Sequence, residues 1–253
     1  MKKVLQILNG IAFVSVVFIN YLSNTGVMNN TTIGEISGDY RSLFTPAGYA
    51  FSIWGIIYLL LLGFIIYQGR SLFVKVRNDD FVNEISFWFI ISCLANSAWV
   101  FCWIYEYTGL SCICIFILLF SLLKIVINTK IALEKVPFSV KIFIWWPFAI
   151  YSGWVTVASI ANVSTYFIKI NWDGFGVSPV IWTIILIVIA TIINLIVTWK
   201  RNMSAFAFVG AWALIAIGVA NSDNTLVTIA NLAAGILIIS SLLNAFKNRK
   251  SIQ

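Results

Sequence analysis

The side chains of this sequence that could act on a ligand are mainly aromatic rings. Phe51, Trp54 and Tyr58 are spaced i, i+3 and i+7, so a helix through them would present three rings on one face. Pro46 lies in the polar stretch just before them. An apolar helix that begins beside a polar loop and carries rings on one face indicates a ligand-binding cleft near one membrane surface.

Two neutral amides accompany further tryptophans in other apolar segments. Asn96 precedes Trp99 by three residues, and Asn162 follows Trp154 by eight. Hydrogen bonding between helices is one explanation of such amides. The alternative is that these four residues line a pocket together with Trp54. A ring-lined cleft with a few neutral hydrogen-bonding groups suits a flat apolar ligand such as a tetrapyrrole or a sterol.

Acid–base and metal chemistry have little support in the sequence. It contains no His, which removes the commonest general base, haem ligand and proton relay. The four cysteines lie inside apolar stretches without the spacing of a zinc site, so we interpret them as small core residues: Cys93, Cys102, Cys112 and Cys114. We therefore expect no metal site and no required cofactor.

Charged residues are missing from the middle of the apolar segments. Glu84, Glu106 and Lys124 lie near segment ends, whereas an ion-coupled transporter or pump normally places an ionisable residue at mid-membrane. No segment carries a central Lys for a retinal Schiff base, and there is neither a nucleotide P-loop nor a Gly-x-Ser-x-Gly elbow. These features favour ligand binding over ion-coupled transport.

Composition places these residues in a membrane. Of the 253 residues 61% are hydrophobic and 10% charged, and the mean hydropathy is +0.97, which a water-soluble domain does not tolerate. A helix needs about 20 apolar residues to cross a hydrocarbon core of about 30 Å. Because the apolar stretches are continuous, we predict an all-α polytopic membrane helix bundle and not a barrel. About eight spans are expected, at residues 4–22, 47–67, 82–105, 110–131, 142–163, 177–199, 205–220 and 226–246.

Two of the expected connections are long enough to have a function of their own. Residues 23–45 and 164–176 are both polar, and we interpret the first as a lid over the cleft. Residues 4–22 follow two lysines, but no small-x-small cleavage site comes after them. We therefore expect a retained membrane anchor there and not a signal peptide.

The basic residues predict the orientation in the membrane. With a cytoplasmic N-terminus, only Arg41 and Lys169 of the 16 basic residues fall outside. The other basic residues fall inside: Lys2, Lys3, Arg70, Lys75, Arg77, Lys124, Lys130, Lys135, Lys141, Lys200, Arg201, Lys247, Arg249 and Lys250. Both termini should be cytoplasmic, in what we expect to be a bacterial inner membrane. Because these charges act as topology signals, no nucleic-acid partner is expected.

Three stretches of the chain resemble, in order, motifs of the TspO/MBR family, the tryptophan-rich sensory proteins related to the mitochondrial translocator protein. They read Phe-Thr-Pro-Ala-Gly-Tyr-Ala-Phe-Ser-Ile-Trp-Gly-Ile-Ile-Tyr, Leu-Ala-Asn-Ser-Ala-Trp and Trp-Val-Thr-Val-Ala-Ser-Ile-Ala-Asn. Ala47 and Tyr49 depart from the family's second Pro and first Trp. The resemblance implies these ligand-binding residues: Pro46, Phe51, Trp54, Tyr58, Asn96, Trp99, Trp154, Ala158 and Asn162.

The resemblance also implies a domain organisation. Residues 1–165 would form the family's five-helix core, and residues 166–253 would add three helices and a basic cytoplasmic tail. The ligand would be porphyrin-like or sterol-like, the partners would be the lipid bilayer and this small molecule, and a homodimer is a further expectation. The leading hypothesis is a ligand-binding sensor or regulator. A small-molecule transporter or permease and a tetrapyrrole-degrading membrane enzyme remain as alternatives, so an enzymatic role stays open.

Overall fold

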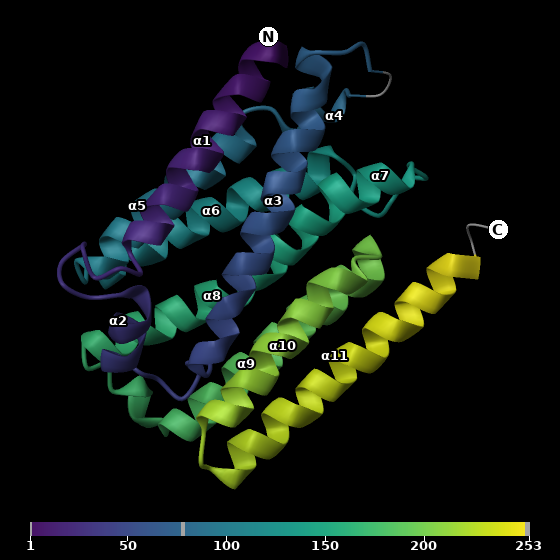
Figure 1. Ribbon diagram of the computed structural model, residues 1–253. Coiled ribbons are helices and arrows are strands. Elements are labelled where there is room, and N and C mark those ends of the chain that lie inside the picture. Colours follow the sequence, from purple (N-terminus) through teal and green to yellow (C-terminus); the bar gives the residue numbers. More distant parts are fainter. Residues whose placement is uncertain (1, 77–78, 251–253) are drawn as a thin grey trace. The chain divides into compact units, whose positions relative to one another are not determined.

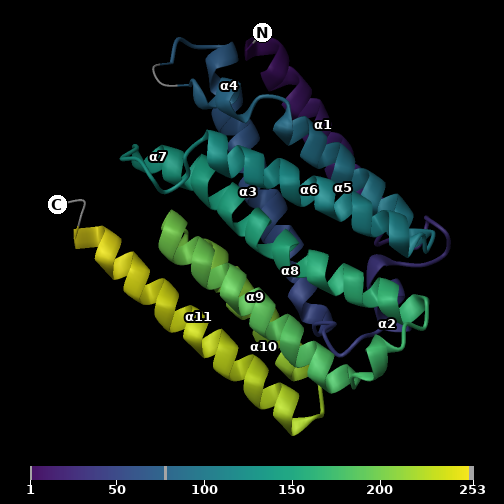
Figure 2. The ribbon, with the colours of Figure 1, turned by 180° about the vertical axis from the view of Figure 1, so that it is seen from behind.

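The computed structural model describes residues 2–76 and 79–250, which form helices and, within those ranges, no strand (Figure 1, Figure 2). The longer helices each coincide with a predicted apolar span. Their bounds are α1 Lys2–Leu22, α3 Ile53–Gly69, α5 Trp88–Ile104, α6 Thr108–Asn128, α8 Trp146–Lys169, α9 Pro179–Arg201, α10 Ser204–Ala220 and α11 Asn224–Lys250. The predicted all-α fold is confirmed.

Six helical segments of the described chain are long and apolar enough to cross a membrane. They are Lys2–Leu22, Gly48–Leu72, Thr108–Asn128, Phe138–Lys169, Pro179–Arg201 and Asn224–Lys247. The apolar helices α5 and α10 are shorter, with 17 residues each, and such a helix is about 25 Å long. The polytopic helical membrane bundle is confirmed. Of these two helices, α5 is shorter than its predicted span 82–105, whereas α10 agrees with its predicted span 205–220.

Two predicted boundaries were wrong. The expected third span is divided, because Ser86 has a φ of +52° and separates α4 (Phe81–Ile85) from α5. The expected loop 164–176 begins only after Lys169, the last residue of α8. The polar residue that suggested the loop, Ser164, satisfies its hydroxyl by donating to the Ile160 carbonyl oxygen of its own helix at 3.0 Å.

The expected 23–45 connection contains a short helix, α2 (Ile33–Asp39). It begins with a reciprocal cap: the Glu35 amide donates to Thr32 Oγ1 at 3.2 Å, and the Thr32 amide donates to Glu35 Oε2 at 2.7 Å. The spacing Thr-x-x-Glu is the capping box that begins many helices. The remaining short elements are η1 Gly48–Ser52, η2 Arg70–Leu72, α7 Phe138–Val140, the π-helical η3 Lys141–Trp145 and η4 Gly174–Gly176.

The described chain divides into two compact units. Unit 1 comprises the described parts of Met1–Ile36 and Trp54–Ser152, and unit 2 those of Ser37–Ile53 and Gly153–Gln253. The core of unit 1 includes Phe64, Phe89 and Phe148, all fully buried, with Phe64 at 5.1 Å from each of the other two ring centroids. The predicted division at residue 165 remains a prediction.

Unit 2 is built around α10, which packs against both α9 and α11. Glycines allow close helix approach: a Cβ added at Gly153 of α8 would lie 2.9 Å from the Phe206 carbonyl oxygen of α10. A side chain at Gly210 would collide with the amide of Asn194 on α9. Small residues at such contacts are typical of helix packing in membranes.

Residues 41–50 are fastened to α10 within unit 2. The Asn221 amide donates to the Leu43 carbonyl oxygen at 2.9 Å, and the Ala47 amide donates to the Ala216 carbonyl oxygen at 3.0 Å. The Arg41 guanidinium donates to the carbonyl oxygen of Ala220. This half of the connection that we interpreted as a lid is therefore held by the last turn of α10, a helix that follows the predicted five-helix core.

Candidate functional site

Four of the nine predicted ligand-binding residues lie in unit 1, where three of them belong to a packed cluster. Trp54 stacks on Tyr58 with ring centroids 5.6 Å apart, and its indole meets the edge of Tyr151 at 5.7 Å. Asn96 is fully buried beside them. Its Nδ2 donates to the Tyr151 hydroxyl at 2.9 Å, and its Oδ1 accepts from Asn20 Nδ2 at 2.8 Å. The structure brings these rings and this amide together, but their hydrogen bonds go to protein groups.

Trp99, the fourth, is stacked against Trp103 with ring centroids 5.5 Å apart and is itself buried. The Trp103 indole donates to the Ile33 carbonyl oxygen at 3.1 Å. The pair therefore also anchors the start of α2.

The other five predicted residues lie in unit 2. Phe51 meets the ring of Trp154 edge-on, with centroids 6.0 Å apart, and Trp154 and Asn162 are each 2% exposed. Pro46 and Ala158 are partly exposed. The structure thus places Phe51 against Trp154, while the role of all nine residues in ligand binding remains a prediction.

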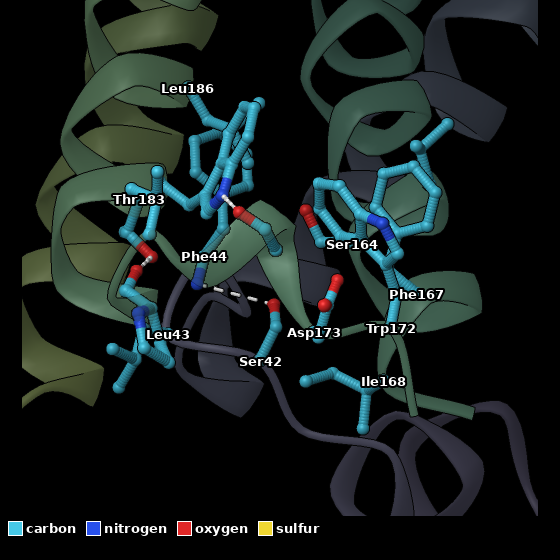
Figure 3. A pocket seen from close by; sticks show the side chains of 15 residues that line it. Ser42, Leu43, Phe44, Ser164, Phe167, Ile168, Trp172, Asp173, Thr183 and Leu186 are labelled. Carbon is cyan, nitrogen blue, oxygen red and sulfur yellow. Dashed lines mark hydrogen bonds between the residues drawn. The ribbon is translucent and has the colours of Figure 1, made fainter. Parts of the chain in front are cut away.

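Unit 2 contains a cavity of about 180 Å³ that none of those nine residues lines (Figure 3). Four segments meet there: the stretch before η1, the last turns of α8, the connection around η4 and the first turns of α9. The lining residues are Ser42, Leu43, Phe44, Val163, Ser164, Phe167, Ile168, Trp172, Asp173, Gly174, Val177, Pro179, Trp182, Thr183 and Leu186. The cavity lies next to the tethered residues 41–50, and its lining was not predicted.

Aromatic rings form much of the wall of this cavity. Trp172 has its ring centroid 4.3 Å from that of Phe167 and 5.2 Å from that of Trp182. The Trp182 indole donates to the Gly174 carbonyl oxygen at 2.8 Å. Gly174 has a φ of +65°, and a Cβ there would lie 2.9 Å from Trp182 Nε1. The close fit of the η4 connection on Trp182 therefore requires glycine.

The polar groups of the cavity offer acceptors more than donors. Thr183 Oγ1 donates to the Pro179 carbonyl oxygen at 2.8 Å, and Ser164 likewise donates within its own helix. A hydroxyl has only one hydrogen, so both keep lone pairs that can accept. Asp173 is exposed, and its Oδ1 accepts from the Phe175 amide at 3.0 Å. Figure 3 shows Ser164 and Asp173 turned toward the middle of the cavity. A flat apolar group that carries N–H or O–H donors would match this lining.

Sequence reasoning missed this cavity because its rings come from separate segments. Trp172 has an adequate explanation as an interfacial residue in any membrane protein. The available signal was the run Trp-Asp-Gly-Phe-Gly, separated from Ser178-Pro179 by one residue, where a turn leads into a capped helix. Ser178 does cap α9, accepting from the Ile181 amide at 3.3 Å. Among the described residues no group of His, Cys, Asp and Glu could hold a metal ion.

The structure is that of a polytopic helical membrane protein, because several of its helices could span a membrane. It also contains an aromatic cavity, the size of a small molecule, beside a tethered loop. A family comparison narrows the class. The chain matches the model of the TSPO-like protein family over residues 6–243, and it belongs to that family. The match continues through α9 and α10 into α11, beyond the five helices that the motifs implied. No curated protein and no solved structure matches the chain.

Proposed function

We propose that the protein is a TspO-type membrane sensor or regulator that binds a flat apolar ligand, such as a porphyrin or a sterol, in the cavity of unit 2. The observation that carries this proposal is the wall of rings formed by Phe167, Trp172 and Trp182 around unfilled space. Rings of this kind stack on flat apolar ligands, and the acceptors in the same lining select ligands with donors. Pyrrole N–H groups and a sterol hydroxyl both meet that requirement.

The volume limits how such a ligand binds. Pockets that enclose a whole drug-sized molecule usually have about 300–1,000 Å³, whereas this cavity has about 180 Å³. A porphyrin would insert one edge into the cavity and leave the rest outside. Residues 42–44 border the cavity and are tied to the end of α10 through Leu43. A ligand that pushes on them would therefore act on α10, and this helix would carry the signal of a sensor.

Localisation and assembly belong to the same proposal. The charge distribution supports cytoplasmic termini and a bacterial inner membrane, with the cavity on the outer side. No cofactor is needed for binding, and a tetrapyrrole would be a ligand and not a prosthetic group. The bilayer and the small ligand are the partners, and a homodimer is compatible with this role.

The direct test is titration of the purified protein with protoporphyrin IX, followed by quenching of Trp fluorescence. A Ser164→Phe variant fills the cavity and retains every Trp, so it should weaken binding at least about 10-fold. The matched control is Gly235→Phe on α11, where an added Cβ meets no atom within 4 Å; its affinity should stay unchanged. Equal affinities in the two variants would rule out this cavity as the site.

A Trp154→Ala variant separates the cavity from the residues implied by the family motifs. If only this variant loses affinity, the ligand binds where the motifs predict. If saturable quenching is absent from the wild type, the proposed ligand class is wrong. Porphyrin flux in proteoliposomes would instead favour a transporter, and light-dependent product formation would favour a tetrapyrrole-degrading enzyme.

A further inference from the structure

Unit 1 carries a separate groove of about 480 Å³ between α1 and the end of α3. Its walls are mainly aliphatic, with Ile7, Ile11 and Val14 on α1 and Ile65 and Leu72 on the other side. The groove shares no lining residue with the cavity of unit 2. It needs its own explanation.

Lipid is the natural occupant of this groove. Ile7, Ile11 and Val14 are 53%, 58% and 66% exposed, so these apolar side chains face hydrocarbon when α1 spans the membrane. Gly10 leaves the groove open, since a Cβ added there would meet no atom within 4 Å. An unfilled groove would forfeit dispersion contacts along its whole wall, and an acyl chain can restore them.

One end of the groove is polar and ties the two helices together. Gln6 Nε2 donates to the Gln68 carbonyl oxygen at 2.5 Å and to Ser71 Oγ at 2.7 Å. Asn9 Nδ2 donates to Gln68 Oε1 at 3.0 Å. These bonds fix the spacing of α1 and α3 where the chain leaves the apolar region, at the level of a lipid head group.

A lysine extends the groove-lining face of α1 past this polar end. Lys3, Ile7, Gly10 and Val14 are spaced i, i+4, i+7 and i+11, which places them on one helix face. Lys3 is exposed, and no acidic side chain of the described residues forms an ion pair with it. Its ammonium can therefore meet an anion at the end of the groove.

The neighbouring Lys2 is already committed to protein carboxylates. It donates to Asp79 and lies 3.8 Å from Asp80. Burial alone would raise the pKa of Asp79, but hydrogen bonds from Lys2 and Ser71 and the charge of Lys2 lower it below its ordinary value. The ammonium of Lys3 is therefore available to an anionic ligand, whereas that of Lys2 is already paired with Asp79.

We propose that this groove binds a membrane phospholipid with an anionic head group, its acyl chain along Ile7 and Val14 and its phosphate at Lys3. The apolar walls select a chain, and the positive charge selects the head group. The inference is independent of the proposed function, because it concerns different residues and a different ligand.

Native mass spectrometry of the full-length protein in mild detergent can test the head-group preference. Phosphatidylglycerol and phosphatidylcholine with identical chains are compared, and phosphatidylglycerol should be retained more strongly. Lys3→Gln should weaken phosphatidylglycerol binding about five-fold, the fold-change that corresponds to about 1 kcal/mol for one lysine near an anionic surface. Phosphatidylcholine binding should not change. Lys2→Gln removes the same charge one residue away and should leave the preference intact.

A second pair of variants tests the acyl-chain contact. Gly10→Leu fills the groove and should weaken retention of both lipids. Gly55→Leu on α3 also adds a side chain where a Cβ meets no atom within 4 Å, but outside the groove, and should bind like the wild type. Equal binding of the two lipids by the wild type, equal effects of the two lysine variants, or equal effects of the two glycine variants would each overturn the proposal.

Discussion

Two groups of aromatic rings in this protein differ in what their polar neighbours do. In unit 1, Trp54 packs on Tyr58 and Tyr151, and Asn96 has protein partners for both its donor and its acceptor. In unit 2, the rings around Trp172 leave about 180 Å³ unfilled, and the hydroxyls beside them still have lone pairs to offer. Both groups combine rings with neutral polar residues, so composition alone does not separate them. Unfilled space and the polar neighbours do. The rings of unit 1 pack on one another beside a saturated Asn96 amide and stabilise a core, whereas the hollow of unit 2 can accept a ligand.

The largest difference should appear in stability. Asn96→Leu leaves Asn20 and Tyr151 without their buried partner, and we expect a loss of about 1–2 kcal/mol in the free energy of unfolding. Ser164→Ala removes a hydroxyl that bonds only within its own helix, so its cost should stay below about 0.5 kcal/mol. Reversible unfolding in mixed micelles, followed by Trp fluorescence, measures both. Similar losses in the two variants would contradict the distinction between a saturated and an unsaturated group.

For ligand binding we expect the opposite: substitutions around the cavity of unit 2 should cost more affinity than substitutions in the ring cluster of unit 1. Trp182→Ala removes one wall of the cavity together with the bond to Gly174, and we expect about a 10-fold loss of porphyrin affinity. Trp54→Ala should lower stability and leave the affinity within about two-fold, because the Trp54 ring packs on protein side chains. Fluorescence quenching on folded samples gives both affinities. A larger affinity loss in Trp54→Ala would move the site to the cluster that the family motifs predict.

Ala substitutions at two glycines separate the effect of the cavity's shape on binding from the effect of backbone strain. Gly174 and Gly176 both have positive φ, at +65° and +75°, but only a Cβ at Gly174 would collide with Trp182. Ala at either position should cost about 1 kcal/mol of stability through strain. Only Gly174→Ala should also shift the Trp182 ring, and we expect roughly a three-fold change in affinity. Equal affinities in the two variants would mean that the position of Trp182 does not matter for binding.

The sequence predicts a group of rings well when its contacts depend on residues close together in the chain, and poorly when they depend on distant segments. Continuous apolar runs predict the helices, because a backbone in hydrocarbon must satisfy its hydrogen bonds within one segment. The spacing of Trp54 and Tyr58 likewise predicts their stacking. The contact of Phe167, Trp172 and Trp182 depends on a turn with Gly174 at positive φ, which no helical or strand period signals. The spacing of Thr32 and Glu35 is that of a capping box and predicts the start of α2, although both residues lie outside the apolar runs.

The smallest expected effect concerns the two tyrosines beside the saturated Asn96 amide. The Tyr58 hydroxyl lies near Asn96 but forms no hydrogen bond of good geometry with any described residue, whereas the Tyr151 hydroxyl accepts from Asn96 at 2.9 Å. Tyr58→Phe should therefore change the free energy of unfolding by less than about 0.5 kcal/mol, and Tyr151→Phe should cost about 1 kcal/mol. Both substitutions keep the ring, so packing is matched and only the hydroxyl differs. If Tyr58→Phe leaves stability unchanged yet weakens porphyrin binding, the Tyr58 hydroxyl contacts the ligand. The ligand would then bind in the ring cluster of unit 1, although the Asn96 amide there is saturated.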